Sequence, residues 1–416
     1  MSTPSLLNVP YRLKAGTLYS QIPETGAGDF VVSRTTSPTA NRSTRVNADG
    51  FIELVNDNVP RLDYPLGGAV NGCAALLVEP AATNGIRNNS MVGAVAGTPG
   101  NLPTNWSNTG SGLTRQSIVT GTLNGIPYVD IRISGTANNT FHDVFWDTSN
   151  IIAASVGQNW VASCYLQIIA QPNPPVNYTL AMREFNSGGG FLGVFTGPAL
   201  SISTTSFNRF SFTRALNQAT VAFVHPSLFL TLVNGQTYDF TIRIGYPQME
   251  IGLVATSVIP TTTASITRGN EIMTRASATA LIGQSEGSIY WDIAAVGGVL
   301  SGTGNPEWGV RNEATTNFIG LTSNGTASPF RISATATVGS LINYQANITS
   351  GKAALAWSSA GLVLYVNGVQ VATSATNPNF SFTRADIRGV TMPFKANAFA
   401  LYPNRLSNTE LIALTT

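Results

Sequence analysis

Short alternations of apolar and polar residues recur along most of the chain, with turn residues between them. Two of the clearest are Asp130-Ile131-Arg132-Ile133 and Thr241-Ile242-Arg243-Ile244. A period of two residues is typical of strands that bury one face of a sheet, and many short strands at regular spacing are typical of antiparallel sandwiches. The pattern predicts one sandwich over residues 101–258 and a second over residues 276–416.

The remaining segments divide the chain further. Residues 1–41 are rich in Pro and Gly and hold only short β-like pieces, so we expect an extended arm that packs on a partner chain. Residues 42–100 predict a small β-rich connector, and residues 259–275, around Pro260, predict a linker. The expected fold class is therefore all-β: an N-terminal arm and connector followed by two antiparallel jelly-roll sandwiches.

Three local signals are sharper than the rest. Asp49-Gly50 predicts a tight hairpin between strands over 44–47 and 51–54, and Asn367-Gly368 predicts another between two apolar runs. The closing stretch SNTELIAL predicts a helix, because Ser407 and a Glu at position 410 form a capping box.

The charge balance narrows the range of partners. Lys and Arg number 22, Asp and Glu number 20, and the formal net charge is +2. Binding to a phosphate backbone needs a clear basic excess, so we expect no nucleic-acid partner. The sequence has no run of ~18 apolar residues and no signal-peptide pattern at its start, which predicts assembly in a cytoplasm without membrane insertion. Cys73 and Cys164 match no metal spacing and are expected to be free thiols.

The connector carries an unusual density of charge without a recognisable catalytic arrangement. We expect its charged residues to form ion pairs between strands. The residues concerned are Arg42, Arg45, Arg61, Glu53, Asp57, Asp63 and Glu79. A catalytic carboxylate pair is the alternative, but nothing beside these acids would bind and orient a substrate.

A candidate glycan site lies in the first sandwich. An aromatic ring beside polar groups suits a sugar, which stacks its apolar face and hydrogen-bonds its hydroxyls. Asn138, Asn139, His142 and Trp146 offer that combination, and Trp106 and Trp308 lie among loop residues that could be exposed. The alternative is that the tryptophans are core residues and that His142 and His225 are structural.

No cofactor is expected. A calcium ion at the rim of the second sandwich is the alternative, held by oxygen ligands from Asn305, Glu307, Asn312 and Glu313. These residues lack the dense carboxylate spacing of a strong calcium loop. A glycosidase would need two carboxylates in one groove, and the sequence identifies no such pair.

The connector also carries a family resemblance. RSTRVNADGFIELVNDNVPRLDY, from residue 42, followed by CAALLVEPAATN, from residue 73, resembles a segment of bacteriophage virion proteins found in tail fibres, head fibres and spikes. In those proteins it usually precedes a jelly-roll module similar to carbohydrate-binding modules and a concanavalin A-like, laminin-G-like sandwich. Residues 351–416 resemble the last strands and closing helix of that second sandwich.

The resemblance implies a structural virion protein, assembled in the host cytoplasm and placed on the particle surface as a homotrimer. Residues 1–100 would then bind other virion proteins, and the sandwiches would bind host-surface polysaccharide. The resemblance brings no catalytic residues, so we expect no enzymatic activity. Two alternatives remain open: a purely architectural or capsid-decoration protein that binds no sugar, and a polysaccharide depolymerase.

Overall fold

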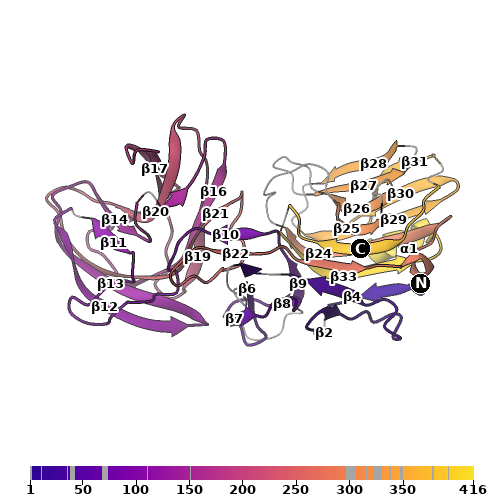
Figure 1. The fold of residues 1–416 in the computed structure, drawn as a ribbon, viewed down its shortest axis with the longest axis horizontal. Helices are drawn as coiled ribbons and strands as arrows, with labels where there is room; N and C mark the ends of the chain where they lie inside the picture. Colours follow the sequence, from indigo (N-terminus) through magenta and orange to yellow (C-terminus); the bar gives the residue numbers. More distant parts are fainter. Residues whose placement is uncertain are drawn as a thin grey trace.

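A computed structural model shows two antiparallel β-sandwiches side by side (Figure 1). It describes the chain in fourteen stretches. These are residues 2–10, 12–34, 36–37, 43–67, 74–109, 111–149, 151–296, 306–313, 317–322, 330–336, 339–346, 350–376, 379–391 and 393–416. The all-β fold class and the antiparallel sheets predicted from the alternation are confirmed.

The first sandwich is formed by two facing sheets from the middle of the chain. One sheet has the strand order β12 (Leu113–Leu123), β13 (Ile126–Thr136), β21 (Thr237–Ile251), β16 (Asn159–Ala170) and β19 (Asn208–Ala215). The other has the order β11 (Ser107–Thr109), β14 (Phe141–Phe145), β20 (Val221–Thr231), β17 (Asn177–Asn186) and β18 (Phe191–Thr196), with β15 (Ile152–Ala153) also paired to β20. The inward residues of both sheets form a single core that includes Trp146 and Trp160.

The second sandwich draws its strands from both ends of the chain. One sheet has the order β31 (Val369–Ser374), β30 (Gly361–Val366), β29 (Gly351–Ser358), β24 (Gly287–Val296), β33 (Phe394–Tyr402), β9 (Ala75–Val78) and β8 (Arg61–Asp63), and β1 (Leu6–Asn8) also pairs with β33. The facing sheet has the order β2 (Leu13–Lys14), β3 (Thr17–Leu18), β4 (Phe30–Ser33), β23 (Ile272–Arg275), β32 (Arg384–Arg388), β25 (Pro306–Arg311), β26 (Phe318–Thr322), β27 (Phe330–Ala336) and β28 (Gly339–Ala346).

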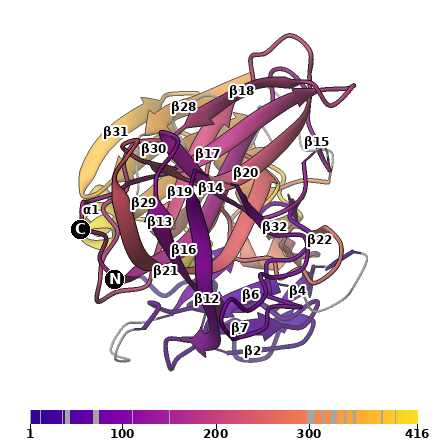
Figure 2. The same ribbon diagram turned by 90° about the vertical axis from the view of Figure 1, so that its left-hand side faces the viewer.

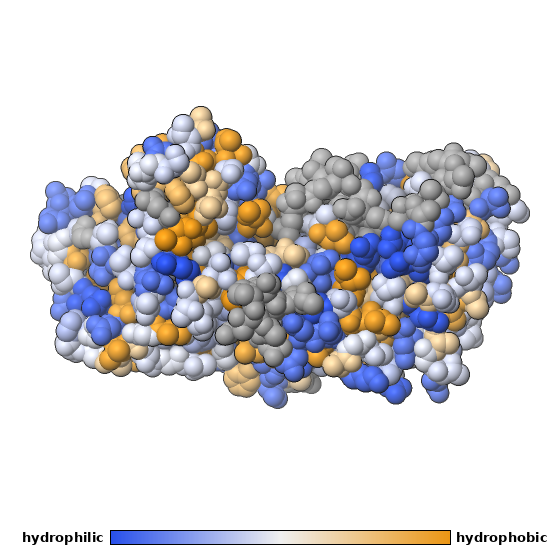
Figure 3. Space-filling model, viewed as in Figure 1, coloured by the Kyte–Doolittle hydropathy of each residue, from blue (hydrophilic) through white to orange (hydrophobic). Residues whose placement is uncertain are grey.

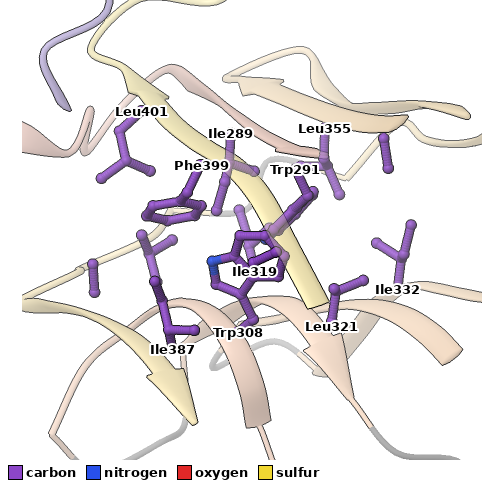
Figure 4. Close-up of a cluster of buried hydrophobic side chains, with 14 of the residues drawn as sticks. Ile289, Trp291, Trp308, Ile319, Leu321, Ile332, Leu355, Ile387, Phe399 and Leu401 are labelled. Atoms are coloured by element: carbon purple, nitrogen blue, oxygen red, sulfur yellow. The ribbon is translucent and has the colours of Figure 1, made fainter. Parts of the chain in front are cut away.

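The core of this sandwich lies between those two sheets. Figure 4 shows Trp291 and Phe399 from one sheet packed against Trp308, Ile319 and other apolar side chains from the facing sheet. The rings of Trp308 and Phe394 are stacked, with centroids 5.6 Å apart. Trp291 and Trp308 are fully buried. They therefore serve packing, which large aromatic side chains do most effectively when they are removed from water.

The two remaining local predictions also match the structure. Asn367 and Gly368 join β30 to β31, and both have positive φ, at 49° and 80°, as a two-residue hairpin turn requires. Helix α1 (Asn408–Thr415) begins after Ser407, whose hydroxyl accepts a hydrogen bond from the backbone N–H of Glu410 in a complete capping box. One flank of α1 packs on the outer face of the β29–β30 part of the sheet.

Residues 1–41 differ from the extended arm expected from the sequence. Leu6 lies opposite Leu401 in the ladder between β1 and β33, and Val32 lies opposite Met273 in the ladder between β4 and β23. Leu6, Leu18 and Phe30 are fully buried in the second core. These strands are too short to be stable alone, but β1 and β4 pair with β33 and β23, which lie more than 200 residues further along the chain.

The connector and the linker together form the junction between the sandwiches. Strands β6 (Ser43–Val46) and β7 (Ile52–Val55) make the expected hairpin. Residues 266–268 form β22, which pairs with both β10 (Ala82–Asn84) and β5 (Thr36–Ser37). The segment 259–275, expected to be a linker, is therefore partly strand.

A buried charge cluster, which we call the junction cluster, ties these segments together. It consists of Arg34, Arg61, Glu79, Arg268 and Glu271, all of which are buried. Arg61 Nη2 lies 2.7 Å from Glu79 Oε2 and 2.7 Å from Glu271 Oε1. Arg268 Nη1 lies 3.0 Å from Glu79 Oε2, and Arg34 Nη1 lies 3.2 Å from Glu271 Oε1. The cluster joins the N-terminal segment, the connector and the segment that precedes the second sandwich.

The junction cluster gives the fold a specific sensitivity to acid. Burial alone would raise the pKa of Glu79, but Arg268 and Arg61 and hydrogen bonds from Ser257 outweigh it and lower the pKa from 4.5 to about 2. Stability contributed by ionised Glu79 is therefore fully present above pH 4.5 and is lost as the pH falls towards 2. We expect the melting temperature of the wild-type protein to fall more steeply across this window than that of Glu79→Gln. Parallel slopes for the two proteins would contradict the assignment.

Candidate functional site

The residues predicted to bind glycan do not form one exposed site. Trp106, Trp146, His142 and Trp308 are all buried. The indole Nε1 of Trp106 donates to the Asn88 carbonyl at 2.8 Å, so this side chain is fixed in the core wall. Trp308 belongs to the second sandwich and lies far along the chain from the others.

Only the two asparagines remain accessible. Asn138 and Asn139 are exposed in the turn between β13 and β14. Asn139 Oδ1 accepts a hydrogen bond from the backbone N–H of Thr140 at 2.7 Å, which is a local turn contact. No aromatic residue among those predicted accompanies them at the surface.

Both histidines are buried and make hydrogen-bond contacts within the fold. His142 Nδ1 lies 3.2 Å from the Ser111 hydroxyl, and burial lowers the pKa of His142 to about 4, so the ring is neutral at pH 7. His225 Nε2 lies 2.7 Å from the Asp147 carbonyl oxygen, and burial also lowers the pKa of His225. No group of three or more His, Cys, Asp or Glu side chains positioned to hold a metal occurs among the described residues.

Strand β14, which carries His142, nevertheless leads to a candidate site on its other face. Along β14, Val144 points into the core, as do His142 before it and Trp146 just after it. Because successive side chains of a strand alternate between faces, Phe141, Asp143 and Phe145 lie on the opposite face. His142 and Trp146, which the sequence analysis proposed as glycan contacts, therefore lie on the core side of this segment.

That face carries a group of aromatic rings, which we call the aromatic face. Its members are Phe141, Phe145, Phe185, Phe191, His225 and Phe229. Phe141 stacks on Phe229 with centroids 5.7 Å apart, and Phe145 stacks on His225 at 4.4 Å. Phe191 is 57% exposed, the most accessible ring of the group. In Figure 2 the strands β14, β17, β18 and β20 that carry these rings lie close together.

Arg183 lies among the rings and links them to a buried acid. Its guanidinium carbon is 5.6 Å from the centroid of Phe141, 5.4 Å from that of Phe145 and 5.7 Å from that of Phe191. Its Nη2 lies 2.5 Å from Asp143 Oδ2. The Arg183 side chain is 14% exposed, so it is mostly but not completely buried.

Asp143 holds Arg183 in place from below. The carboxylate is fully buried, and its Oδ1 accepts a hydrogen bond from the Ser227 hydroxyl at 2.7 Å. Burial raises the pKa of Asp143, although Ser227 and Arg183 both favour its ionised form. The carboxylate therefore positions Arg183 and is not accessible to a ligand.

The surface around this face contains both apolar and polar residues. Figure 3 shows apolar residues gathered near the top of the first sandwich, where Figure 1 places β17 and β20, with polar residues beside them. Aromatic rings with a fixed cation between them offer flat apolar surfaces and hydrogen-bond donors at short range. This combination suits the apolar faces and hydroxyl groups of a sugar.

The charged residues of the connector are used in structure. Arg45 Nε lies 2.7 Å from Glu53 Oε1, and Asp63 Oδ2 lies 2.7 Å from Lys395 Nζ. Arg61 and Glu79 pair within the junction cluster. Asp57 lies in the turn after β7, and Arg42 is outside the described residues. Among the described connector residues, Glu53, Asp63 and Glu79 each have a cationic partner.

The proposed calcium ligands are only partly described. Asn305 lies outside the described residues, and Glu307 belongs to β25. Glu313 Oε2 lies 2.9 Å from Arg384 Nη1, so this acid has a cationic partner. Cys164 is a buried free thiol whose pKa is raised by burial, and Cys73 is outside the described residues.

Comparison with known proteins gives only distant likenesses. No family model and no curated protein matches the chain. A solved structure of the tripod (BppUct-A-L) from the baseplate of bacteriophage Tuc2009 is 12% identical, covers 86% of this chain and 98% of its own, and has a TM-score of 0.29. The xylan-binding CBM22-1 domain of Paenibacillus barcinonensis Xyn10C is 7% identical, covers 42% of this chain and 94% of its own, and has a TM-score of 0.26.

A sialidase of Trypanosoma rangeli is similarly distant. It is 8% identical, covers 72% of this chain and 62% of its own, and has a TM-score of 0.28. The structures with some likeness to the chain thus include a phage baseplate protein, a carbohydrate-binding module and a sialidase. We draw no functional argument from likenesses of this size. Within the described residues, no helix is long and apolar enough to cross a membrane.

Proposed function

We propose that the protein displays its first sandwich to bind a surface glycan through the aromatic face. The observation that carries this proposal is the placement of Arg183 between three phenylalanine rings, held by the buried Asp143. The buried ion pair fixes the guanidinium before a ligand arrives, which reduces the entropy lost on binding. A partly exposed ring such as Phe191 then offers a stacking surface for a sugar.

The acidic residues of this sheet fit glycan binding better than glycoside hydrolysis. Hydrolysis of a glycosidic bond needs one carboxyl group to protonate the leaving oxygen and a second to act as base or nucleophile. Asp143 is bound to Arg183, and Glu184 is fully buried with its Oε1 2.5 Å from Arg214 Nε. Neither acid is free to approach a sugar, so a depolymerase is the weaker proposal for this face.

We further propose that the chain is a fibre, spike or decoration subunit of a phage particle and works as a homotrimer. The support is the resemblance of residues 42–64 and 73–84 to a virion segment, together with the two-sandwich architecture. Three copies of a weak site on one particle would add through avidity. Residues 6–33 pack into the second sandwich, so any virion contact of the N-terminal segment would use its outer surface.

Replacing Phe191 tests the site, since this ring is exposed enough for its loss to leave the core unchanged. We expect Phe191→Ala to weaken binding to glycan hits by about fivefold, because one aromatic contact is worth roughly 1 kcal/mol and 1.4 kcal/mol is a factor of ten. The measurement is titration of the purified full chain against ligands found on an array of bacterial surface polysaccharides.

Phe51→Ala is the matched control. Phe51 is 44% exposed next to the β6–β7 hairpin, so this variant removes an exposed ring of the same kind at a distance from the aromatic face. Its affinity should equal that of the wild type. An array with no hits would favour the architectural alternative, and equal affinities for all three proteins would place the glycan site elsewhere.

A further inference from the structure

A cavity lies on the second sandwich, away from the aromatic face. It has a volume of about 730 Å³, and its walls include Val9, Asp63, Tyr64, Asp292, Lys395 and Asn397. This volume is within the roughly 300–1,000 Å³ that ligand pockets of proteins usually have. We call it the β8–β33 pocket, since Asp63 ends β8 and Lys395 and Asn397 lie on β33.

The pocket occupies the outer face of a sheet whose inner face is core. Along β33, Phe394 and Ala396 are buried in the second core, whereas Lys395 and Asn397 alternate with them and point outward. On β24, Trp291 faces the core and Asp292 faces the pocket. Helix α1 covers the β29–β30 part of the same outer face, so the pocket lies on the part that the helix leaves uncovered.

The polar groups of the pocket are already held in fixed positions. Asp63 Oδ1 accepts a hydrogen bond from the Val46 N–H at 2.8 Å, and its Oδ2 lies 2.7 Å from Lys395 Nζ. Asn397 Nδ2 donates to Asp292 Oδ1 at 3.2 Å. The ammonium group and the amide each retain further hydrogen-bonding capacity, because Lys carries three donors and Asn two donors and an acceptor.

The chemistry of the walls indicates the class of ligand. Tyr64 is half-buried against the core and presents an aromatic surface, while carboxylate, amide and ammonium groups supply donors and acceptors. Two carboxylates against one ammonium leave the pocket net negative, which disfavours an anionic polymer. We propose that the β8–β33 pocket is a second ligand site that binds a neutral, hydroxyl-rich oligosaccharide.

This inference does not rest on the aromatic face, because the two sites are in different sandwiches. If both bind, a single chain engages a polysaccharide at two points, and the affinity of the whole chain exceeds that of either site. The Phe191→Ala protein is the appropriate background for the test, since it weakens the first site without touching the second. If the aromatic face binds nothing, the wild-type protein and Phe191→Ala give the same result and the pocket is still tested.

Substitution of Asn397 tests the pocket. With neutral oligosaccharides from a glycan array as probes, calorimetry on the Phe191→Ala full chain should retain a binding event whose affinity equals that seen in the wild-type protein. We expect Asn397→Ala in that background to weaken it about 3–10-fold, the effect of one or two lost hydrogen bonds. Asn397→Asp keeps the shape, removes the amide donor beside Asp292, and should weaken binding at least as much.

The control is Asn208→Ala, which removes an exposed amide from β19 in the other sandwich and should leave the affinity unchanged. A melting temperature for each variant shows that it has folded. The proposal is overturned if the Phe191→Ala protein binds no neutral oligosaccharide, if it binds only anionic ones, or if Asn397→Asp binds as well as Asn208→Ala.

Discussion

Arg61→Ala is expected to lower the free energy of unfolding by about 3–5 kcal/mol, the usual cost of breaking a buried ion pair from one side. Burial by itself would lower the pKa of Arg61, but Glu271 and Glu79 outweigh it and raise that pKa, so the guanidinium is charged at any pH at which the protein is folded. Its removal leaves two carboxylates in the interior with one fewer cation. It also removes the hydrogen bonds to the Thr44 carbonyl and the Ser257 hydroxyl, at 2.9 and 2.6 Å.

The matched control is Arg132→Ala. Arg132 pairs with Asp239 at 2.7 Å, but the two side chains are 50% and 53% exposed. Solvent screens such a pair, so its loss should cost much less stability than the loss of Arg61. Urea denaturation of both variants beside the wild type gives the comparison. Equal small losses for the two would mean that the junction cluster does not stabilise the fold.

The junction cluster also shows which ion pairs could be predicted from the sequence and which could not. The density of Arg and acidic residues after residue 42 predicted ion pairs, and Arg45 with Glu53 are a pair within one hairpin that periodicity alone can find. Glu271 was absent from that prediction. It lies 192 residues beyond Glu79, whose backbone N–H donates to its Oε2, and no local pattern indicates a partner at such a distance.

The same limit explains the N-terminal segment. Leu6-Leu7-Asn8 and Phe30-Val31-Val32-Ser33 have the alternation of strands, but their partners are β33 and β23. From the sequence alone such short strands are indistinguishable from an unpaired arm. The strands of the two sandwiches were easier to predict, because many of them pair with neighbours in the chain, as β12 does with β13 and β30 with β31.

The candidate site was missed for a different physical reason. The sequence analysis placed no strand at residues 141–145, so it could not tell which side chains of β14 are buried, and a shift of one residue exchanges the two faces. Trp146 and His142 were preferred because an aromatic ring beside polar side chains suits a sugar. The accessible side of the sheet instead uses phenylalanine and arginine, whose frequent occurrence in cores and ion pairs gives no signal by itself. The Arg183–Asp143 pair joins β17 to β14, and that contact becomes visible only when both strands are paired to β20.

The burial of Trp146 leads to the second large expected effect, a loss of stability. Trp146→Ala should lower the free energy of unfolding by about 3–5 kcal/mol, because it removes a fully buried indole from the first core and leaves a cavity. Phe191→Ala should change stability by less than about 1 kcal/mol, since the ring is more than half exposed. Urea denaturation measures both values.

Glycan binding should respond in the opposite order. Under conditions in which both variants are folded, Trp146→Ala should retain the wild-type affinity and Phe191→Ala should not. Trp146→Phe is the graded control, because it keeps most of the buried ring and should lose less stability than Trp146→Ala. If Trp146→Ala is as stable as the wild type and loses glycan binding, then the tryptophan predicted from the sequence is the ligand contact and the aromatic face is not the site.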